Sequence, residues 1–352
     1  MDGGERTYIS VIICTRNRGA SLRRTLDSLL TPSNLARNDW ELILVDNGST
    51  DDTSRITSEY AAKFPGHVRT LMELRKGKSY ALNSGIRAAR GEILAFTDDD
   101  CEADANYLVG IRTVFEDPGV YVAQGRIVLE LRHEPPWLTP TLKTFLAHLD
   151  HDNLEEAWAR EPLLFGANML LRRSAVARAG GFRTDLGPGT PAGFGEEMEL
   201  SRRLLNLGIR PLWAPHVLIH HRPEVGRLRR RYYIERFYRN GVSLARMRPA
   251  NIDPPWWNPQ LPAWRYKAYY AKVVVMALLR WAHLSLLGRS TEALNVLLST
   301  AQDAGGTLEL LRLRRPGVTE SPVPKVLNED GQPIVPDEDR PEAAATKVAT
   351  RN

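Results

Sequence analysis

Cysteine is scarce in this sequence, which has only Cys14 and Cys101 among its 352 residues. Two cysteines cannot build the disulfide framework of a small secreted domain. Both lie in apolar segments whose pattern predicts interior strand ends, so we expect buried, reduced thiols and a reducing compartment. The N-terminus, MDGGERTYIS, has no apolar run of the kind found in a secretory signal. The sequence therefore predicts a cytoplasmic protein.

Long apolar runs are also missing. The longest candidate, residues 269–287, is interrupted by Lys272, Arg280 and His283. Because a spanning helix needs about 20 mostly apolar residues, this segment is better interpreted as an amphipathic helix on a partner or a membrane surface. The mean hydropathy of −0.33 excludes a polytopic membrane protein.

Glycine is absent where two nucleotide-binding motifs need it. The run Gly77-Lys78-Ser79 looks like the end of a P-loop, but that motif needs a glycine at position 72, which is Met72. A dinucleotide-binding enzyme needs a glycine-rich turn after its first strand, and residues 14–19 read CTRNRG instead. Both interpretations are therefore set aside.

Charge of one sign is barely in excess, since 47 Lys and Arg face 42 Asp and Glu, a net charge of +5. This total does not indicate nucleic-acid binding. The excess is local, because residues 222–248 hold nine arginines, two glutamates and no lysine. Arginine suits bidentate recognition of phosphate, so we expect this segment to face anionic lipid or a lipid-linked diphosphate.

Strand and helix patterns alternate through the first hundred residues. Apolar runs at 8–14, 40–45, 68–72 and 92–97 predict strands, and helical spacing at 21–30, 53–64 and 79–90 predicts helices. This order predicts an α/β fold with a Rossmann-like, mostly parallel sheet covered on both faces. Further strands are expected at 120–131 and 165–172, and helices at 196–207 and 227–247. The tail from 315 has six prolines and no aromatic residue, which predicts disorder.

Polar residues follow the predicted strands, at the sheet edge where ligands bind in such folds. Asp98, Asp99 and Asp100 end the fourth strand. An acidic triplet is most often a solvated loop or a helix N-cap, but at this edge its hard oxygen ligands suit Mg²⁺ or Mn²⁺ holding a diphosphate.

Five segments together resemble glycosyltransferase family 2, over about residues 7 to 248. They are SVIICTRNR (10–18), LVDNGSTDDT (44–53), KGKSYALNSGIRAARGEILAFTDDD (76–100), FGANMLLRRSAVARAGGF (165–182) and FGEEMELSRRL (194–204). The resemblance implies the GT-A fold, a nucleoside-diphosphate sugar donor, a divalent metal (Mn²⁺ or Mg²⁺) and inversion at the anomeric centre. It implies a catalytic domain at 1–222, with a nucleotide-binding half at about 7–118 and an acceptor half at about 119–222. A helical basic and amphipathic extension at 223–314 and the tail at 315–352 complete the predicted domains.

The resemblance also assigns site residues. Asp98 and Asp100 match the outer positions of the family's DxD motif, and a histidine such as His221 completes the metal shell in some GT-A enzymes. Asp46 would accept a hydrogen bond from the base, and Gly166 would bring backbone close to the sugar. The remaining residues predicted to bind the nucleotide sugar are Thr15, Arg16, Asn17, Asn47, Lys78, Asn83, Asp99 and Asn168.

Glu196 and Glu197 form the second predicted centre. Inverting transfer needs a carboxylate to take the proton of the acceptor hydroxyl. The family usually has Glu-Asp here, so Glu197 is the predicted base and Glu196 the second candidate. As helix N-terminal acids alone, they would contribute only a few tenths of a kcal/mol each. Trp137, and the Trp pair at 256–257, can either stack on acceptor sugars or fill a core.

The leading hypothesis is therefore that the protein transfers a sugar from a nucleoside-diphosphate sugar to a hydroxyl group of a polysaccharide, glycolipid or lipid-linked glycan. UDP is the commonest nucleotide of such donors in the family. The alternatives are a nucleotidyltransferase acting on sugar phosphates and a non-catalytic basic module that binds anionic membrane or nucleic acid. We expect no nucleic-acid partner, and peripheral association with the inner face of the cytoplasmic membrane through 222–248 and 269–287.

Overall fold

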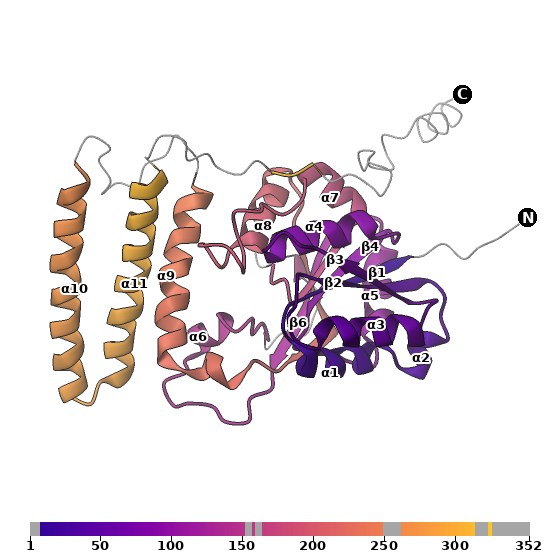
Figure 1. Cartoon of the computed structure of the whole chain (residues 1–352), viewed down its shortest axis with the longest axis horizontal. Coiled ribbons are helices and arrows are strands. Elements are labelled where there is room, and N and C mark those ends of the chain that lie inside the picture. Colours follow the sequence, from indigo (N-terminus) through magenta and orange to yellow (C-terminus); the bar gives the residue numbers. More distant parts are fainter. Residues whose placement is uncertain (1–7, 152–156, 159–163, 249–261, 314–322, 326–352) are drawn as a thin grey trace, which may run out of the picture.

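The computed structural model describes residues 8–151, 157–158, 164–248, 262–313 and 323–325. Nine strands of these residues form one sheet, in the order β3-β2-β1-β4-β8-β6-β9-β5, with β7 pairing to β9 (Figure 1). The strands are β1 (Ile9–Thr15), β2 (Trp40–Asp46), β3 (Val68–Met72), β4 (Ile93–Asp98), β5 (Cys101–Ala103), β6 (Val122–Leu129), β7 (Ala157–Trp158), β8 (Asn168–Arg172) and β9 (Leu212–His221).

The first four strands in sheet order, β3, β2, β1 and β4, are parallel to one another, as the alternating pattern predicts. β8 then runs antiparallel to both β4 and β6, whereas β9 runs parallel to β6 and antiparallel to β5. The part of the sheet formed by β8, β6, β9 and β5 therefore contains both parallel and antiparallel pairs. Strands from before and after residue 118 belong to the same sheet.

Alternate residues of the central strands supply two cores, one on each face of the sheet. Val11 and Ile13 of β1 pack with α1 (Gly19–Leu29), α3 (Thr53–Lys63) and α5 (Tyr107–Glu116). Ile12 packs on the other face with α4 (Lys78–Ala88), α7 (Arg173–Ala179) and α8 (Glu196–Asn206). This period-two alternation of side chains explains why the strands read as continuous apolar runs. The predicted fold class is confirmed.

Two short helices complete this part of the chain, and both begin in the same way. Thr31 precedes α2 (Pro32–Leu35) and Thr139 precedes α6 (Pro140–Thr144). Each threonine hydroxyl accepts a hydrogen bond from a backbone N–H of the first turn, and a proline opens each helix. α6 carries the chain toward residues 144–147, which reach the site described below.

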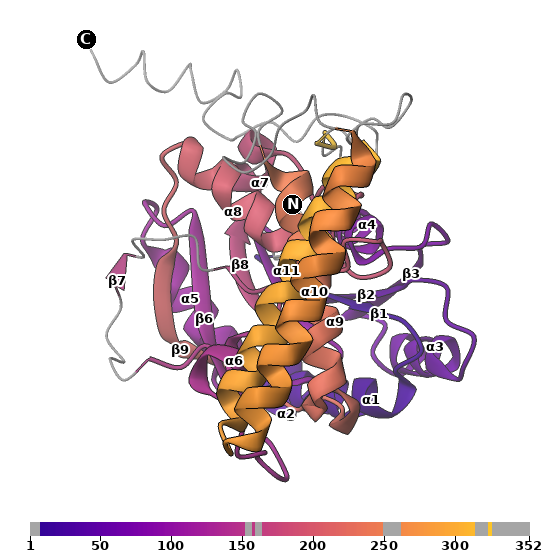
Figure 2. The same cartoon turned by 90° about the vertical axis from the view of Figure 1, so that its left-hand side faces the viewer.

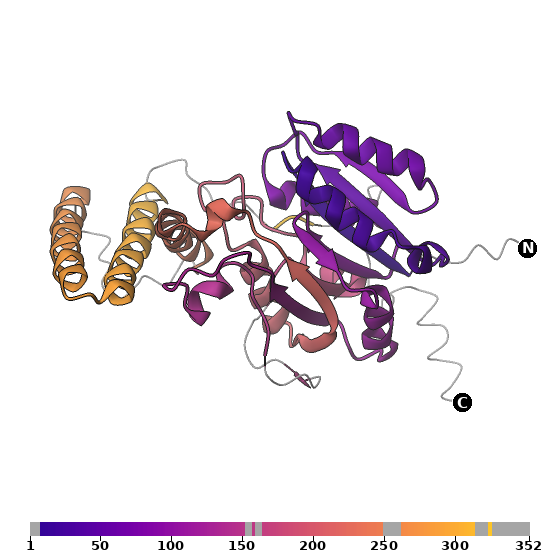
Figure 3. The same cartoon turned by 90° about the horizontal axis from the view of Figure 1, so that it is seen from below.

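The C-terminal helices stand beside the sheet (Figures 1 and 3). A 3₁₀ turn at Val225–Leu228 leads into α9 (Arg230–Met247), followed by α10 (Ala263–Leu286) and α11 (Ser290–Leu313). α11 lies between α9 and α10. Its contact with α9 is close, since a Cβ added at Gly241 would lie 1.8 Å from the carbonyl oxygen of Gln302. Only glycine allows this approach.

A buried ion pair fixes α11 to α9. Arg246 Nε lies 2.8 Å from Glu309 Oε1, and both side chains are almost fully buried. Arg246 also donates to the carbonyl oxygen of Asp185 in the loop before α8. The helical region is therefore joined through one arginine to the loop that leads into the predicted catalytic helix.

Two predictions fall largely outside the described residues. The predicted disordered tail, 315–352, is described only at 323–325, where Gly181 N donates to the carbonyl oxygen of Pro324. The Trp pair at 256–257 is not described. Trp137 packs edge-to-face on Tyr233 at a centroid distance of 5.4 Å, in the cluster between α6 and α9, which favours its core interpretation. Among the described residues, no helix is long and apolar enough to cross a membrane.

Candidate active site

A cavity of about 740 Å³ opens at the carboxyl ends of β1 and β4 and is closed on its far side by α9. The segment at 144–147 and the loop at 188–195 supply further walls. The predicted site residues that line it are Thr15, Arg16, Asn47, Lys78, Asp98, Asp99, Asp100, Gly166, Glu196, Glu197 and His221. Those that do not line it are Asn17, Asp46, Asn83 and Asn168.

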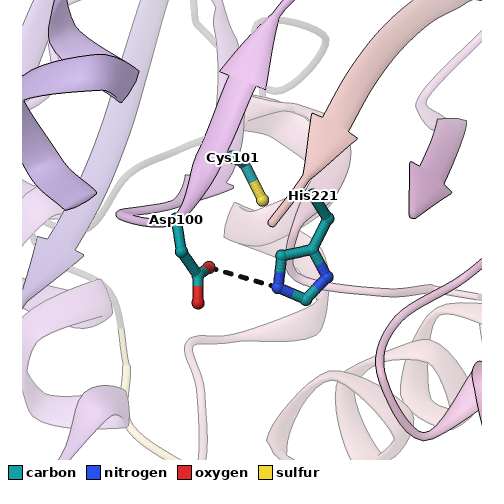
Figure 4. A group of neighbouring side chains, drawn as sticks. All are labelled: Asp100, Cys101 and His221. Atoms are coloured by element: carbon teal, nitrogen blue, oxygen red, sulfur yellow. Dashed lines mark ion pairs between the residues drawn. The ribbon is translucent and has the colours of Figure 1, made fainter. Parts of the chain in front are cut away.

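Asp100 and His221 meet because β5 pairs antiparallel with β9. The register places Cys101 opposite His221, so Asp100, one residue earlier, lies beside the imidazole (Figure 4). His221 Nε2 lies 3.3 Å from Asp100 Oδ1, and both side chains are 2% exposed. The Cys101 thiol is close to both, and together these three groups form the one cluster of possible metal ligands found among the described residues.

One ring nitrogen of His221 is held by the backbone. Nδ1 lies 2.7 Å from the carbonyl oxygen of Leu146, which can only accept, so Nδ1 carries the proton. The second ring nitrogen, Nε2, faces the Asp100 carboxylate. Nε2 and Asp100 Oδ2 are both buried without a hydrogen-bond partner. An imidazole nitrogen and a carboxylate oxygen are both ligands that a divalent metal accepts, so these buried residues fit such an ion.

Two arginines already place positive charge beside Asp100. Arg18 Nη1 lies 3.7 Å and Arg227 Nη2 lies 3.5 Å from Asp100 Oδ2. Burial would raise the pKa of Asp100, but the adjacent His221 imidazole and the charges of Arg227 and Arg18 hold it well below its usual range. Arg18 was not singled out from the sequence, although it follows Thr15 and Arg16 at the same strand end.

Asp98 and Asp99 point to different partners from Asp100. Asp98 Oδ1 accepts a hydrogen bond from Lys78 Nζ at 2.6 Å, and Asp99 Oδ2 accepts one from Thr15 Oγ1 at 2.7 Å. Burial, together with the neighbouring Asp100 charge, raises the pKa of Asp99 to about 7. The structure thus places Asp98 with the lysine, outside the cluster of Asp100 and His221, and its predicted role as a metal ligand stays a prediction.

Lys78 joins the two predicted centres. Its Nζ is 2.6 Å from Asp98 Oδ1 and 3.9 Å from Glu197 Oε1. Burial alone would lower the pKa of this lysine, but Asp98, Glu197 and Glu196 together raise it well above its usual value. Lys78 is therefore a permanent cation between the acidic strand end and the first turn of α8.

Glu196 and Glu197 differ in their surroundings although they are neighbours on α8. Glu196 is 1% exposed and its Oε2 has no hydrogen-bond partner. Burial, followed by repulsion from Glu197, raises the pKa of Glu196 to about 8. The Glu197 side chain is 14% exposed and lies against Gly166, where an added Cβ would be 2.5 Å from Oε1. Glu197 is thus the more accessible of the two carboxyl groups in the cavity wall.

The basic helix α9 forms part of the cavity through Arg236 and Arg239. The Arg236 guanidinium lies 4.2 Å from the centre of the Phe194 ring, and its Nη1 donates to the carbonyl oxygen of Gly193 at 3.2 Å. Ser243 donates to the carbonyl oxygen of Phe194 at 2.7 Å. α9 therefore holds the glycine-rich loop that precedes Glu196, and arginines of the basic segment face the site.

Four predicted residues support loops instead. Asn83 lies on the buried face of α4, where its amide exchanges two hydrogen bonds with the backbone of Phe182. Asn168 donates to the carbonyl oxygens of Arg126 and Val217 from full burial. Asn17, in a left-handed conformation at φ 54°, accepts from Thr50 N, and Asp46 accepts from Ser49 N and Ser54 Oγ. Their predicted contacts with the nucleotide sugar stay predictions.

Asn47 combines both roles. It lines the cavity, yet its Nδ2 donates to the carbonyl oxygens of Glu73 and Arg75, and its Oδ1 accepts from Gly77 N at 2.9 Å. These bonds tie the end of β2 to the turn before α4, and so position Lys78 at the start of that helix. Of the cysteines, Cys101 is buried and Cys14 half-buried, and both are free thiols.

Comparison with known proteins agrees with this geometry. The sequence model of the family described as Glycosyl transferase family 2 matches residues 10–180. The uncharacterized glycosyltransferase YibD of Escherichia coli is 36% identical over 116 residues, which are 33% of each chain. The glucosyl-dolichyl phosphate glucuronosyltransferase of Haloferax volcanii is 22% identical over 182 residues, or 51% of this chain and 57% of that protein.

Among solved structures, a mannosyltransferase from Pyrobaculum calidifontis, in complex with GDP-Man and Mn²⁺, superposes with a TM-score of 0.56. It is 22% identical, and the match covers 88% of both chains. This likeness concerns the fold. The chain spans only 33%, 34% and 39% of the lengths of the curated relatives YibD, alr2836 and AglE.

Proposed function

Because its match over residues 10–180 makes this chain a member of glycosyl transferase family 2, we propose that it moves a sugar from a nucleoside-diphosphate donor to a hydroxyl acceptor. The observation that carries the proposal is the position of Lys78. This lysine touches Asp98 beside the Asp100 and His221 centre and lies 3.9 Å from Glu197, so the two centres share one cavity. A group that would bind diphosphate and a group that would take a proton could thus act on one substrate.

The donor end of the proposed site is built around Asp100 and His221, which would hold Mn²⁺ or Mg²⁺. The bound metal would supply charge neutralisation of the departing diphosphate. Arg18 and Arg227 add fixed positive charge beside Asp100, and a guanidinium matches phosphate oxygens in a bidentate manner. Lys78 would bind a second phosphate oxygen as a point charge. The Mn²⁺ in the mannosyltransferase from Pyrobaculum calidifontis is consistent with this assignment.

The acceptor end of the proposed site is Glu197. Its carboxylate would accept the proton of the acceptor hydroxyl while the hydroxyl oxygen bonds to the anomeric carbon and the bond from that carbon to the diphosphate oxygen breaks. Attack opposite the leaving group inverts the anomeric centre. Gly166 leaves room for the Glu197 carboxylate, because any side chain there would collide with it.

We propose UDP-sugars as the first donors to test, and a polysaccharide, glycolipid or lipid-linked glycan as the acceptor class. Arg236 and Arg239 line the same cavity as Glu197, which suits an acceptor that carries negative charge. A phosphate-linked lipid carrier has this charge. The glucuronosyltransferase of Haloferax volcanii is named for such an acceptor, a glucosyl-dolichyl phosphate.

A donor screen tests the proposal. Purified protein is incubated with nucleoside-diphosphate sugars with and without Mn²⁺, and released nucleoside diphosphate is measured. We expect Asp100→Ala and Glu197→Gln to lower the rate at least about 100-fold, with Asp117→Ala, at the end of α5 and outside the cavity lining, as the control. Release of pyrophosphate would instead indicate a nucleotidyltransferase. Unchanged turnover in both site variants would refute the proposal.

A further inference from the structure

α10 has an apolar surface on the side that faces away from the rest of the protein. Its inner side, Tyr266, Ala277 and Leu284, is buried against α11. Tyr270 and Val273 are half-buried, and every other residue of the helix is exposed. Figure 2 looks straight at this helix, and no described element lies in front of it.

The exposed residues are not arranged at random. One line of apolar residues, here called the outer stripe, runs along the helix at intervals of three or four residues, and further exposed apolar side chains, Val274, Met276 and Leu278, lie beside it. The outer stripe consists of Trp264, Ala268, Ala271, Val275, Leu279, Ala282 and Leu286. At about 100° per residue this line lies opposite the buried side. Trp264, Val275, Leu279 and Leu286 are 64%, 55%, 60% and 87% exposed.

Cations flank the outer stripe. Arg265, Lys267 and Lys272 are exposed and lie to its two sides at helical spacing. No aspartate or glutamate occurs between residues 254 and 291. Exposed aromatic rings, Tyr269 and Trp281, add to the tryptophan of the outer stripe. Aromatic rings and basic side chains of this kind favour the headgroup region of a bilayer.

We propose that α10 docks on the surface of an anionic lipid bilayer, with the outer stripe in the acyl boundary and the flanking cations at the headgroups. The charge pattern selects this occupant over a second copy of the chain, because two such helices would bring cation against cation. The proposal also gives the two basic parts of the C-terminal region different roles. Arg227, Arg236 and Arg239 line the cavity, whereas α10 contributes the lipid-facing surface. This inference does not depend on the proposed function.

Vesicle flotation with the full-length protein tests the docking. The lipid is phosphatidylcholine with one quarter phosphatidylglycerol, and phosphatidylcholine alone is the neutral comparison. We expect binding to the anionic vesicles, lowered about tenfold or more by Val275→Glu. Lys267→Gln and Lys272→Gln should each lower it about fivefold, the contribution of one cation at an anionic surface.

Val109→Glu is the matched control, because Val109 is a 48% exposed valine on helix α5, away from α10. It introduces the same charge and should leave vesicle binding unchanged. Thermal denaturation of each variant checks that the fold is intact. The proposal is overturned if the wild type does not bind anionic vesicles, or if Val275→Glu and Val109→Glu behave alike. It is also overturned if light scattering shows a dimer that Val275→Glu dissociates while vesicle binding is absent.

Discussion

Glu196 and Glu197 allow the same chemical change to be made at two adjacent carboxyl groups, with a small expected loss of kcat at one and a large loss at the other. Glutamine has the shape of a glutamic acid and no charge. The pKa of Glu196 is raised to about 8, so at pH 7 only about one tenth of this carboxyl is ionised. Glu196→Gln therefore replaces a mostly neutral group, and we expect it to lower kcat less than about tenfold. Glu197→Gln removes the proposed base and should lower kcat about 10² to 10⁴-fold.

The same pKa predicts a stability change with a definite sign. In the unfolded chain Glu196 releases its proton near pH 4.5, whereas in the folded protein it keeps it up to about pH 8. The folded state thus binds more protons in this window, so its contribution to the free energy of unfolding falls as the pH rises from about 4.5 to 8. At about 1.4 kcal/mol for each pH unit, the loss between pH 5 and 8 is at most about 4 kcal/mol.

Glu196→Gln removes this loss, because glutamine does not titrate. The difference in melting temperature between the variant and the wild type should therefore grow in favour of the variant between pH 5 and 8. With an unfolding entropy of about 2 cal/mol/K for each residue, the growth is at most about 5 °C for a chain of this length. Differential scanning fluorimetry across this pH range measures it, and released nucleoside diphosphate measures kcat.

Two results would refute the reasoning about this pair. One is a Glu196→Gln variant as inactive as Glu197→Gln, which would transfer the role of base to the buried residue. The other is a melting-temperature difference that does not change between pH 5 and 8, which would mean that Glu196 is ionised in the folded protein. Each result concerns a different measurement, so the two conclusions can fail separately.

Three further changes probe the rest of the site. His221→Ala should weaken Mn²⁺ binding in isothermal titration calorimetry about 10 to 100-fold, whereas His148→Ala, a half-buried histidine outside the cluster, should not. Arg227→Gln should raise the KM for the donor about tenfold with a smaller change in kcat, since one charge-assisted hydrogen bond to the diphosphate is lost. Gly166→Ala should lower kcat about 100-fold by displacing the adjacent carboxylate, whereas Gly226→Ala, which has open space around it, should not.

Each of these expectations has its own contrary result. Equal Mn²⁺ affinity in His221→Ala would remove the imidazole from the metal site. A loss of kcat at unchanged KM in Arg227→Gln would mean that this arginine acts on the transition state alone. A Gly166→Ala variant that melts many degrees lower would indicate a packing role for the glycine.

The sheet could be predicted from the sequence because its strands are buried on both faces. The run predicted at 40–45 has no polar face to confuse its pattern, and the structure ends the strand one residue later, with β2 at Trp40–Asp46. The antiparallel entry of β8 was less visible, since the strand is equally apolar whichever way it runs. Strand direction depends on the connection, and the connection before β8 has no regular pattern of its own.

The acidic strand end could be predicted for the same reason, because the carboxyl ends of parallel strands meet at one edge. The side chain that each of the three carboxylates contacts could not be predicted from the sequence. Asp98, Asp99 and Asp100 are consecutive, yet they face Lys78, Thr15 and His221 respectively. That choice depends on the local turn between β4 and β5 and on the β5 to β9 register, neither of which a single sequence specifies.

The least predictable part of the site was which polar side chains of a helix face the cavity. Lys78 opens α4 and reaches the cavity, but Asn83, five residues later, lies on the buried face with Leu82 and Ile86. A polar residue on that face reads as a ligand-binding group in the sequence. In the structure it satisfies the backbone of Phe182, which is 99 residues away along the chain.

The position of β9 has a consequence for how the molecule can form. It is the last strand among the described residues but lies inside the sheet, between β6 and β5. Asp100 leaves the ribosome long before His221, so the acidic edge must exist for a time without the imidazole that completes it. A fragment that stops before residue 212 would lack both the strand β9 and the His221 side chain that faces Asp100. The segments before and after residue 118 are thus consecutive in sequence but complete one sheet together, and the cluster of Asp100 and His221 forms only when β9 is inserted.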